Sequence, residues 1–208
     1  MKFERYEHRY ALAIIKDDER LNKQFKEFVD TIDGITDNDL INNYRDKKKQ
    51  YLAKGTNFKS LSHSINSLLK ERISGIPGWK SEVDIFNAGE DVIGSTQWKL
   101  DFACENGLAV EVAFNHGEAI AWNLLKPCLA SELNHVRKAF QTKIGVYVCA
   151  TDKMKKAGNF DSASGSYEKV KRYLLPMMNQ LTTPMVIIGL TPPETFKIDS
   201  ITKDIVKL

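Results

Sequence analysis

The stretch WKLDFACENGLAVEVAFNH, from Trp98 to His116, decides the fold. Two apolar runs in it, residues 100–104 and 108–114, flank the dipeptide Asn106-Gly107, and this pattern is a strong signal for a β-hairpin. One acid lies in each run: Asp101 in the first and Glu111 in the second. The stretch therefore predicts an antiparallel hairpin that carries two acids close to its turn.

The relative position of the two acids depends on the length of the turn. A two-residue loop places the two side chains on opposite faces of the sheet. A three-residue loop over residues 105–107, with Gly107 in the left-handed conformation, places Asp101 directly opposite Glu111, with their Cβ atoms about 5 Å apart. The sequence leaves both turns open.

In the second register the pair predicts a divalent-metal site. Like charges placed this close destabilise a sheet unless a cation lies between them. Carboxylate oxygens suit Mg²⁺, with Mn²⁺ as an alternative, and Mg²⁺ keeps several waters and binds substrate phosphates. The alternative is that the acids are simply solvated, which is common near hairpins. Glu111 fits that alternative less well, because its neighbours on both sides are apolar.

The length of the chain fits a single domain, or a compact domain with an appended subdomain. The chain has 208 residues, of which 42% are hydrophobic, and its net charge of +3 permits a nucleic-acid partner without requiring one. The three cysteines are widely spaced in apolar contexts, which predicts reduced core residues and a cytoplasmic location. No apolar run approaches the ~20 residues that span a bilayer, so we expect no membrane partner. Within the domain we expect a largely helical part (1–78), a core (79–190) and a tail (191–208).

The order of elements predicts a three-layer sandwich, in which helices cover both faces of a central mixed β-sheet. Residues 10–15 form either a short strand or the entry to a helix. Pro127 should begin a helical segment that runs to Phe140. The tail, residues 197–208, should add an edge strand or a dimer arm. The other expected elements are helices 17–32, 36–49, 61–73, 118–126 and 167–175, strands 83–86, 144–150 and 185–190, and loops 87–96 and 153–165.

The pattern Asp101-x9-Glu111-Val112-Ala113-Phe114, between upstream helices and a later buried strand, resembles the core of the PD-(D/E)xK nucleases. More closely, it resembles restriction endonucleases of the BglII/BstYI type, in which the second acid lies in Glu-Val-Gln-Phe. Trp79-Lys80 falls in register upstream, the loop 154–166 is rich in small polar residues, and strand 186–190 also fits. The resemblance covers residues 79–190, with a looser likeness in the N-terminal helices.

The resemblance implies a homodimeric, Mg²⁺-dependent type II endonuclease with a restriction-endonuclease-like fold. Such an enzyme cuts both strands of a short palindromic site in double-stranded DNA, often one with a GATC core. Asp101 and Glu111 would bind the metal, and Glu82 would approach it. The residues that would contact DNA are Asn115, His116, Ser162, Ser164 and Ser166, with Lys153, Lys155 and Lys156 on the phosphates.

One position departs from the family pattern. Two residues after the second acid, the family places Lys, Glu or Gln to position the attacking water, and here the residue is Ala113. Lys99 lies opposite Ala113 in the three-residue register and could take over this role. Alternatively, Ala113 marks a lost or engineered residue, or the protein binds DNA without cutting it. A structure-specific repair nuclease with the same core is a further alternative.

Overall fold

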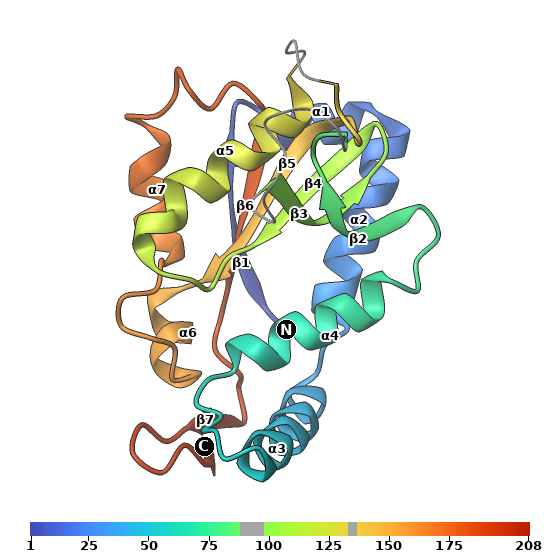
Figure 1. Cartoon of the computed structure of the whole chain (residues 1–208). Helices are drawn as coiled ribbons and strands as arrows, with labels where there is room; N and C mark the ends of the chain where they lie inside the picture. Colours follow the sequence, from blue (N-terminus) through green and yellow to red (C-terminus); the bar gives the residue numbers. More distant parts are fainter. Residues whose placement is uncertain (88–97, 133–136) are drawn as a thin grey trace.

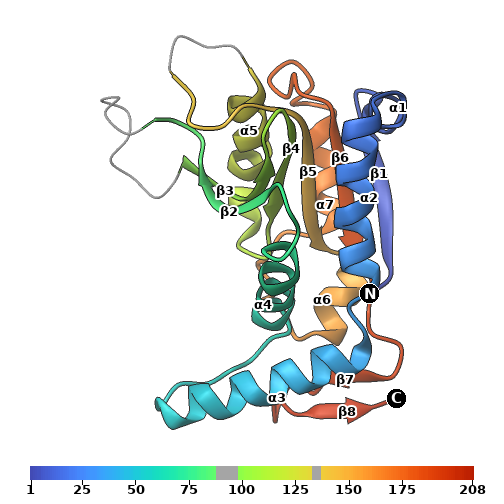
Figure 2. The same cartoon turned by 90° about the vertical axis from the view of Figure 1, so that its right-hand side faces the viewer.

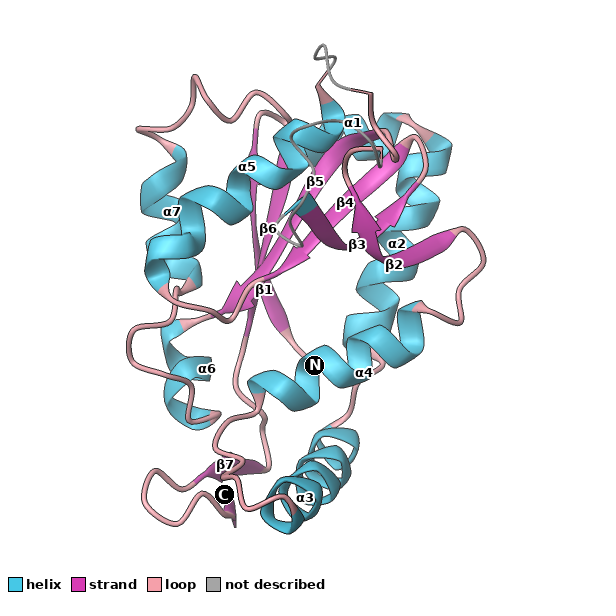
Figure 3. Ribbon diagram, in the orientation of Figure 1, coloured by secondary structure: helices cyan, strands magenta, loops and turns pink. Residues whose placement is uncertain are grey.

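The centre of the protein is a six-stranded mixed sheet with helices on both of its faces (Figures 1 and 3). The computed structural model describes residues 1–87, 98–132 and 137–208. The strands are ordered β1-β6-β5-β4-β3-β2 across the sheet, with β4, β5 and β6 parallel to one another and the other neighbours antiparallel. The predicted three-layer sandwich is confirmed.

The strands follow the apolar runs of the sequence closely. Their bounds are β1 Phe3–His8, β2 Trp79–Asp84, β3 Lys99–Cys104, β4 Gly107–Val112, β5 Thr142–Ala150 and β6 Met185–Leu190. β5 and β6 are buried over almost their whole length, as their continuous apolar runs predict. The predicted strand 83–86 begins earlier, at Trp79, and most of the predicted loop 87–96 lies outside the described residues.

The N-terminal segment is largely helical, and part of it covers one face of the sheet. It contributes α1 Ala11–Asp17, α2 Glu19–Asp33, α3 Asp37–Ala53 and α4 Ser62–Ile73, so residues 10–15 enter a helix and do not form a strand. α2 packs its apolar stripe against β4, and the carboxylate of Asp18 caps the helix by accepting hydrogen bonds from the N–H groups of Arg20 and Leu21. Thr36 and Asp39 form a capping box at the start of α3.

The opposite face is covered by α5 Ile120–Ser131 and α7 Tyr167–Leu174, with the short 3₁₀ turn η2 Gly117–Ala119 before α5. The prediction that Pro127 begins a second helix is wrong, because Pro127 lies inside α5 and the helix ends at Ser131. Proline removes one helical hydrogen bond. Here, however, Pro127 is buried against Gly145 of β5, and a Cβ atom added at Gly145 would lie 2.9 Å from Cβ of Pro127. Burial of the helix face outweighs the local preference for a break.

Two further segments differ from expectation. Residues 152–157 form α6 Asp152–Ala157 and not part of a polar loop, because Thr151 caps the helix and the buried Met154 anchors it. The tail forms a separate two-stranded sheet, β7 Phe196–Ile198 and β8 Ile205–Lys207, which lies beside α3 and is not an edge strand of the central sheet (Figure 2). Tyr44 of α3 donates a 2.9 Å hydrogen bond to the Lys203 carbonyl and fastens the tail there.

The state of the cysteines and the character of the helices can be compared with the expectations from composition. Cys104, Cys128 and Cys149 are buried and free, as predicted. Among the residues that the structure describes, no helix combines the length and the apolar character needed to cross a membrane.

Candidate active site

The hairpin β3–β4 adopts the register that brings the two acids together. Phe102 pairs with Val110 and Ala103 with Ala109, so the loop has three residues and Asp101 lies opposite Glu111. The left-handed residue of the turn is Asn106, with φ of 52°, and not Gly107 as predicted. Both residue types tolerate this conformation, and the packing of the rest of the molecule decides between them.

Gly107 has a different role, because its lack of a side chain allows α2 to approach the start of β4 closely. A Cβ atom at position 107 would lie 1.9 Å from Oε1 of Gln24, a buried side chain on α2. Gly107 therefore permits helix and hairpin to pack together, and this contact fixes the hairpin against the N-terminal layer.

Asp101 is held in place by the opposite strand. Its Oδ2 atom accepts a 2.7 Å hydrogen bond from the Val112 N–H. Burial raises the pKa of Asp101 above its ordinary value, while the Val112 N–H and the charge of Lys126 oppose the rise. The carboxylate is thus oriented by the backbone next to Glu111.

Glu111 is the most deeply buried acid of the site, with 3% of its surface exposed. Burial raises its pKa to about 8, the charge of Asp101 adds to the rise, and Lys126 opposes it. Its Oε2 atom lies 2.7 Å from Nζ of Lys126. Its Oε1 atom is buried and has no hydrogen-bond partner among the described residues. A buried carboxylate oxygen without a partner is costly unless something else binds it.

Lys126 is a site residue that the sequence did not reveal. It lies on α5, and its Nζ atom donates to Glu111 Oε2 and, over 3.0 Å, to the Lys99 carbonyl. Only 14% of its side chain is exposed. No motif marks it; the available signal is a lysine at the edge of the apolar stripe of the first helix after the acid-bearing strand.

Glu82 and Lys99, the other two predicted site residues, lie on β2 and β3. Ser81 pairs with Phe102 and Val83 with Leu100, which places Glu82 opposite Asp101. The Glu82 charge contributes to raising the pKa of Asp101, after burial as the main cause, although its carboxylate also pairs with Lys70 at 3.2 Å.

Lys99 is directed toward β2. Its Nζ atom lies 3.6 Å from Oδ1 of Asp84, the residue with which it pairs across the strands. Its backbone carbonyl, rather than its ammonium group, contacts the site, through Lys126.

The two acids could bind a metal ion whose other ligands are water and substrate. Among the described residues, no three or more Asp, Glu, His or Cys side chains form a cluster that could bind an ion by themselves. Mg²⁺ is commonly bound by one or two carboxylates, with water and substrate phosphate as the other ligands. Asp101 and Glu111, with the unpartnered Oε1 atom, match that smaller requirement.

The chain leaves β4 directly into the segment predicted to contact DNA. The Gly165 N–H donates to the Asn115 carbonyl over 2.9 Å, and the Gly117 N–H donates to the Ala163 carbonyl over 2.8 Å. These bonds join the exit of β4 to the loop before α7. The side chain of Asn115 accepts a 3.2 Å hydrogen bond from Asn123 of α5, whereas 67% of the His116 side chain is exposed.

The three predicted serines differ in exposure. Ser162 is exposed. Ser164 is buried and its hydroxyl donates to the Asp161 carbonyl over 2.6 Å. Ser166 is also buried, and it caps α7 by accepting from the Lys169 N–H. Ser164 and Ser166 therefore shape the loop, and Ser162 presents its side chain outward.

The three predicted lysines also divide into two kinds. Lys153 and Lys156 are exposed on α6. Lys155 is partly buried, and its Nζ atom donates to the carbonyls of Ser162 and Ser164 over 3.1 and 2.5 Å. Lys155 thus braces the loop, while the other two are free to meet a phosphate.

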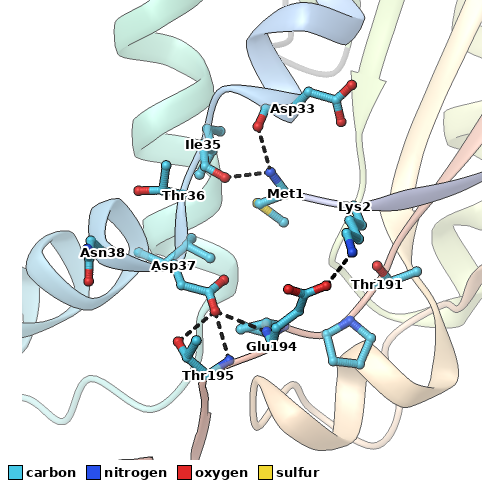
Figure 4. Close-up of a pocket in the computed structure, with 13 residues that line it drawn as sticks. Met1, Lys2, Asp33, Ile35, Thr36, Asp37, Asn38, Thr191, Glu194 and Thr195 are labelled. Atoms are coloured by element: carbon cyan, nitrogen blue, oxygen red, sulfur yellow. Dashed lines mark hydrogen bonds and ion pairs between the residues drawn. The ribbon is translucent and has the colours of Figure 1, made fainter.

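A pocket of about 550 Å³ lies elsewhere, between the N-terminus, the start of α3 and residues 191–195 (Figure 4). Its polar groups bind one another: Asp37 accepts from the N–H groups of Glu194 and Thr195, and the Met1 ammonium group donates to the Ile35 carbonyl. These contacts hold the tail against α3, and we assign the pocket no part in the chemistry.

The fold and the site together define a restriction-endonuclease-like protein, in which a mixed sheet presents paired acids from an antiparallel hairpin. The profile of the family "Restriction endonuclease BglII/BglIII" matches residues 3–190, so the chain belongs to that family and is a type II site-specific nuclease. The match includes the N-terminal helices and extends beyond the predicted coverage of 79–190.

Solved structures agree on the fold. The crystal structure of restriction endonuclease BglII complexed with a DNA 16-mer is 16% identical, with a TM-score of 0.66, and the alignment covers 100% of this chain and 92% of that one. The crystal structure of free BglII is 14% identical, with a TM-score of 0.53 and coverage of 95% and 83%. No curated protein matches the chain significantly.

Proposed function

We propose that the protein is a Mg²⁺-dependent endonuclease that cuts both strands of a short palindromic DNA site, with Asp101 and Glu111 as its metal ligands. The observation that carries the proposal is the Oε1 atom of Glu111, which is buried without a hydrogen-bond partner among the described residues and belongs to the residue opposite Asp101. Mn²⁺ would satisfy the same oxygen ligands.

The fold would hold the two acids in position before metal and DNA bind. A bound divalent ion supplies an activated water and neutralises charge on the phosphate in the transition state. The Val112 N–H fixes the orientation of Asp101, and burial keeps bulk water away from Glu111. Orientation of this kind makes a large contribution to catalysis, because the groups need not reorganise during the reaction.

The DNA would lie along the edge at which β4 ends. Family membership supports DNA as the substrate, and the similar BglII structure contains DNA. The exposed side chains of His116 and Ser162 are candidates for base contacts, and Lys153 and Lys156 for phosphate contacts. A GATC core is the recognition sequence that the family resemblance suggests.

We also propose that the protein acts as a homodimer on DNA. The part of the chain that the structure describes carries one such site, formed by Asp101 and Glu111, and a palindromic site presents two equivalent phosphates related by a two-fold axis. Two copies related by the same axis would place one site at each strand.

A second candidate is a DNA-binding relative that does not cut. Ala113 favours it, because its side chain can neither position water nor bind a phosphate. This alternative keeps the DNA-contacting surface and differs from the main proposal only in turnover.

The variant Asp101→Asn tests the proposal. It keeps an oxygen that can accept from the Val112 N–H but removes the charge, so cleavage should be lost while specific DNA binding in Ca²⁺ persists. Asp30→Asn, on the exposed side of α2, is the matched control and should cut as the wild type does. Normal cleavage by Asp101→Asn would exclude this carboxylate from the mechanism.

A further inference from the structure

Ala113, the position that departs from the family pattern, is packed against α5. Ala113 is 4% exposed and lies in a buried apolar cluster. The cluster includes Ile120, Leu124 and Cys128, which all belong to α5. A charged side chain at position 113 would be buried in this cluster, which is costly. The small residue lets α5 pack directly against β4, so a water-positioning group has to come from another element.

The same helix brings a cation to the acid. Lys126 of α5 reaches Glu111, 15 residues earlier in the chain, with an Nζ–Oε2 distance of 2.7 Å. Its second partner is the Lys99 carbonyl at 3.0 Å. An ammonium group has three N–H donors, so the two contacts that Lys126 makes within the described residues leave one donor for a ligand.

Two other lysines near the site have different partners. Lys99 pairs with Asp84 on β2, and Lys70 pairs with Glu82. Among the described residues, Lys126 is the lysine that forms an ion pair with Glu111. The pair is also deeply placed, with 14% and 3% of the two side chains exposed. Buried ion pairs contribute little net stability compared with apolar residues of similar size, which favours a functional reason for this one.

We propose that Lys126 supplies the cationic group that position 113 lacks, and that its remaining N–H donates to the water that attacks the scissile phosphate. Glu111 would then use one oxygen for the lysine and leave Oε1 for the metal, so a single carboxylate positions both. The inference rests on the proposed metal-dependent cleavage. Strand register suggested Lys99 for the water-positioning role. The inference assigns that role to Lys126 of α5 instead.

The test compares Lys126→Met with Lys126→Arg. Methionine keeps an unbranched side chain of similar length without charge, and arginine keeps the charge. In single-turnover cleavage with Mg²⁺, Lys126→Met should lower the rate constant by about 100-fold or more, the usual scale for removing one donor that stabilises charge in the transition state. Lys126→Arg should retain an intermediate rate. Lys23→Ala, at an exposed site of α2, is the control for general effects of removing a lysine.

A second readout needs no turnover. In metal-free buffer the ammonium group places a positive charge beside the DNA phosphate, so Lys126→Met should weaken DNA affinity by about tenfold. Ca²⁺ should restore that affinity to within about threefold of wild type, and the restored binding would also show that the variant is folded.

The outcomes separate this inference from the proposed function. An unchanged cleavage rate in Lys126→Met, beside an active wild type, would overturn the role of Lys126 alone. Equal losses in Lys126→Met and Lys126→Arg, or unchanged metal-free affinity, would also contradict it, because a merely structural lysine predicts those results. Wild-type protein that binds DNA but never cuts it would overturn both proposals.

Discussion

The variant Glu111→Gln should change how stability depends on pH in the metal-free protein. Burial, and then the Asp101 charge, raise the pKa of Glu111 from 4.5 to about 8 in the folded protein. In the unfolded chain the carboxyl group returns to its ordinary value. Between these two values the folded state holds a proton that the unfolded state has released, so stability falls as pH rises and levels off above the folded pKa.

The size of the effect follows from the pKa difference. One pKa unit corresponds to about 1.4 kcal/mol, so the wild type should lose about 2–3 kcal/mol of unfolding free energy between about pH 6 and about pH 9. Glutamine does not titrate and can still accept a hydrogen bond from Lys126, so this component of the slope should disappear in the variant. The comparison isolates Glu111, because the remaining titrating groups are shared.

The assay is urea unfolding in EDTA at the two pH values, for wild type, Glu111→Gln and the control Glu71→Gln on the exposed side of α4. We expect Glu71→Gln to follow the wild type and Glu111→Gln to lose less stability on going to about pH 9. Parallel pH dependences in wild type and Glu111→Gln would refute the claim that Glu111 is buried with a raised pKa.

Three further predictions concern DNA, packing and assembly. Replacing Lys153 and Lys156 by Ala should reduce the slope of log affinity against log salt by about 2 units, and an unchanged slope would place them away from the phosphates. Gly189→Ala would bring a Cβ atom to 2.5 Å from Cγ of Tyr167. This overpacking should cost about 1–3 kcal/mol in urea unfolding, and a neutral result would contradict the packing of α7 on β6. Sedimentation of the DNA complex should show two chains per duplex, and one chain per duplex would exclude the dimer.

Much of the fold could be predicted from local sequence patterns. Continuous apolar runs identified β5 and β6, and the spacing of Leu21, Phe25, Phe28 and Ile32 identified α2. The failures occurred where packing overrides local preference. Pro127 predicts a helix break but is buried within α5, and the lysine-rich segment after Thr151 predicts a loop but is anchored as a helix by Met154.

The site could be predicted only in part. The sequence supplied Asp101 and Glu111 and two possible registers, but it could not choose between them, because the close approach of Gln24 to Gly107 is a contact between distant segments. For the same reason it could not supply Lys126. The contact of Lys126 with Glu111 depends on how α5 packs on the sheet, and strand register alone pointed to Lys99, which pairs with Asp84 instead.

Digestion of long DNA tests most directly whether the protein, with Asp101 and Glu111 opposed on one hairpin, cuts DNA at a specific site. Wild-type protein with Mg²⁺ should produce discrete fragments whose ends share one short palindromic sequence, and EDTA should abolish them. Sequencing of the fragment ends would identify the site. A smear would contradict site specificity, and intact DNA under conditions in which the protein binds it would contradict cleavage itself.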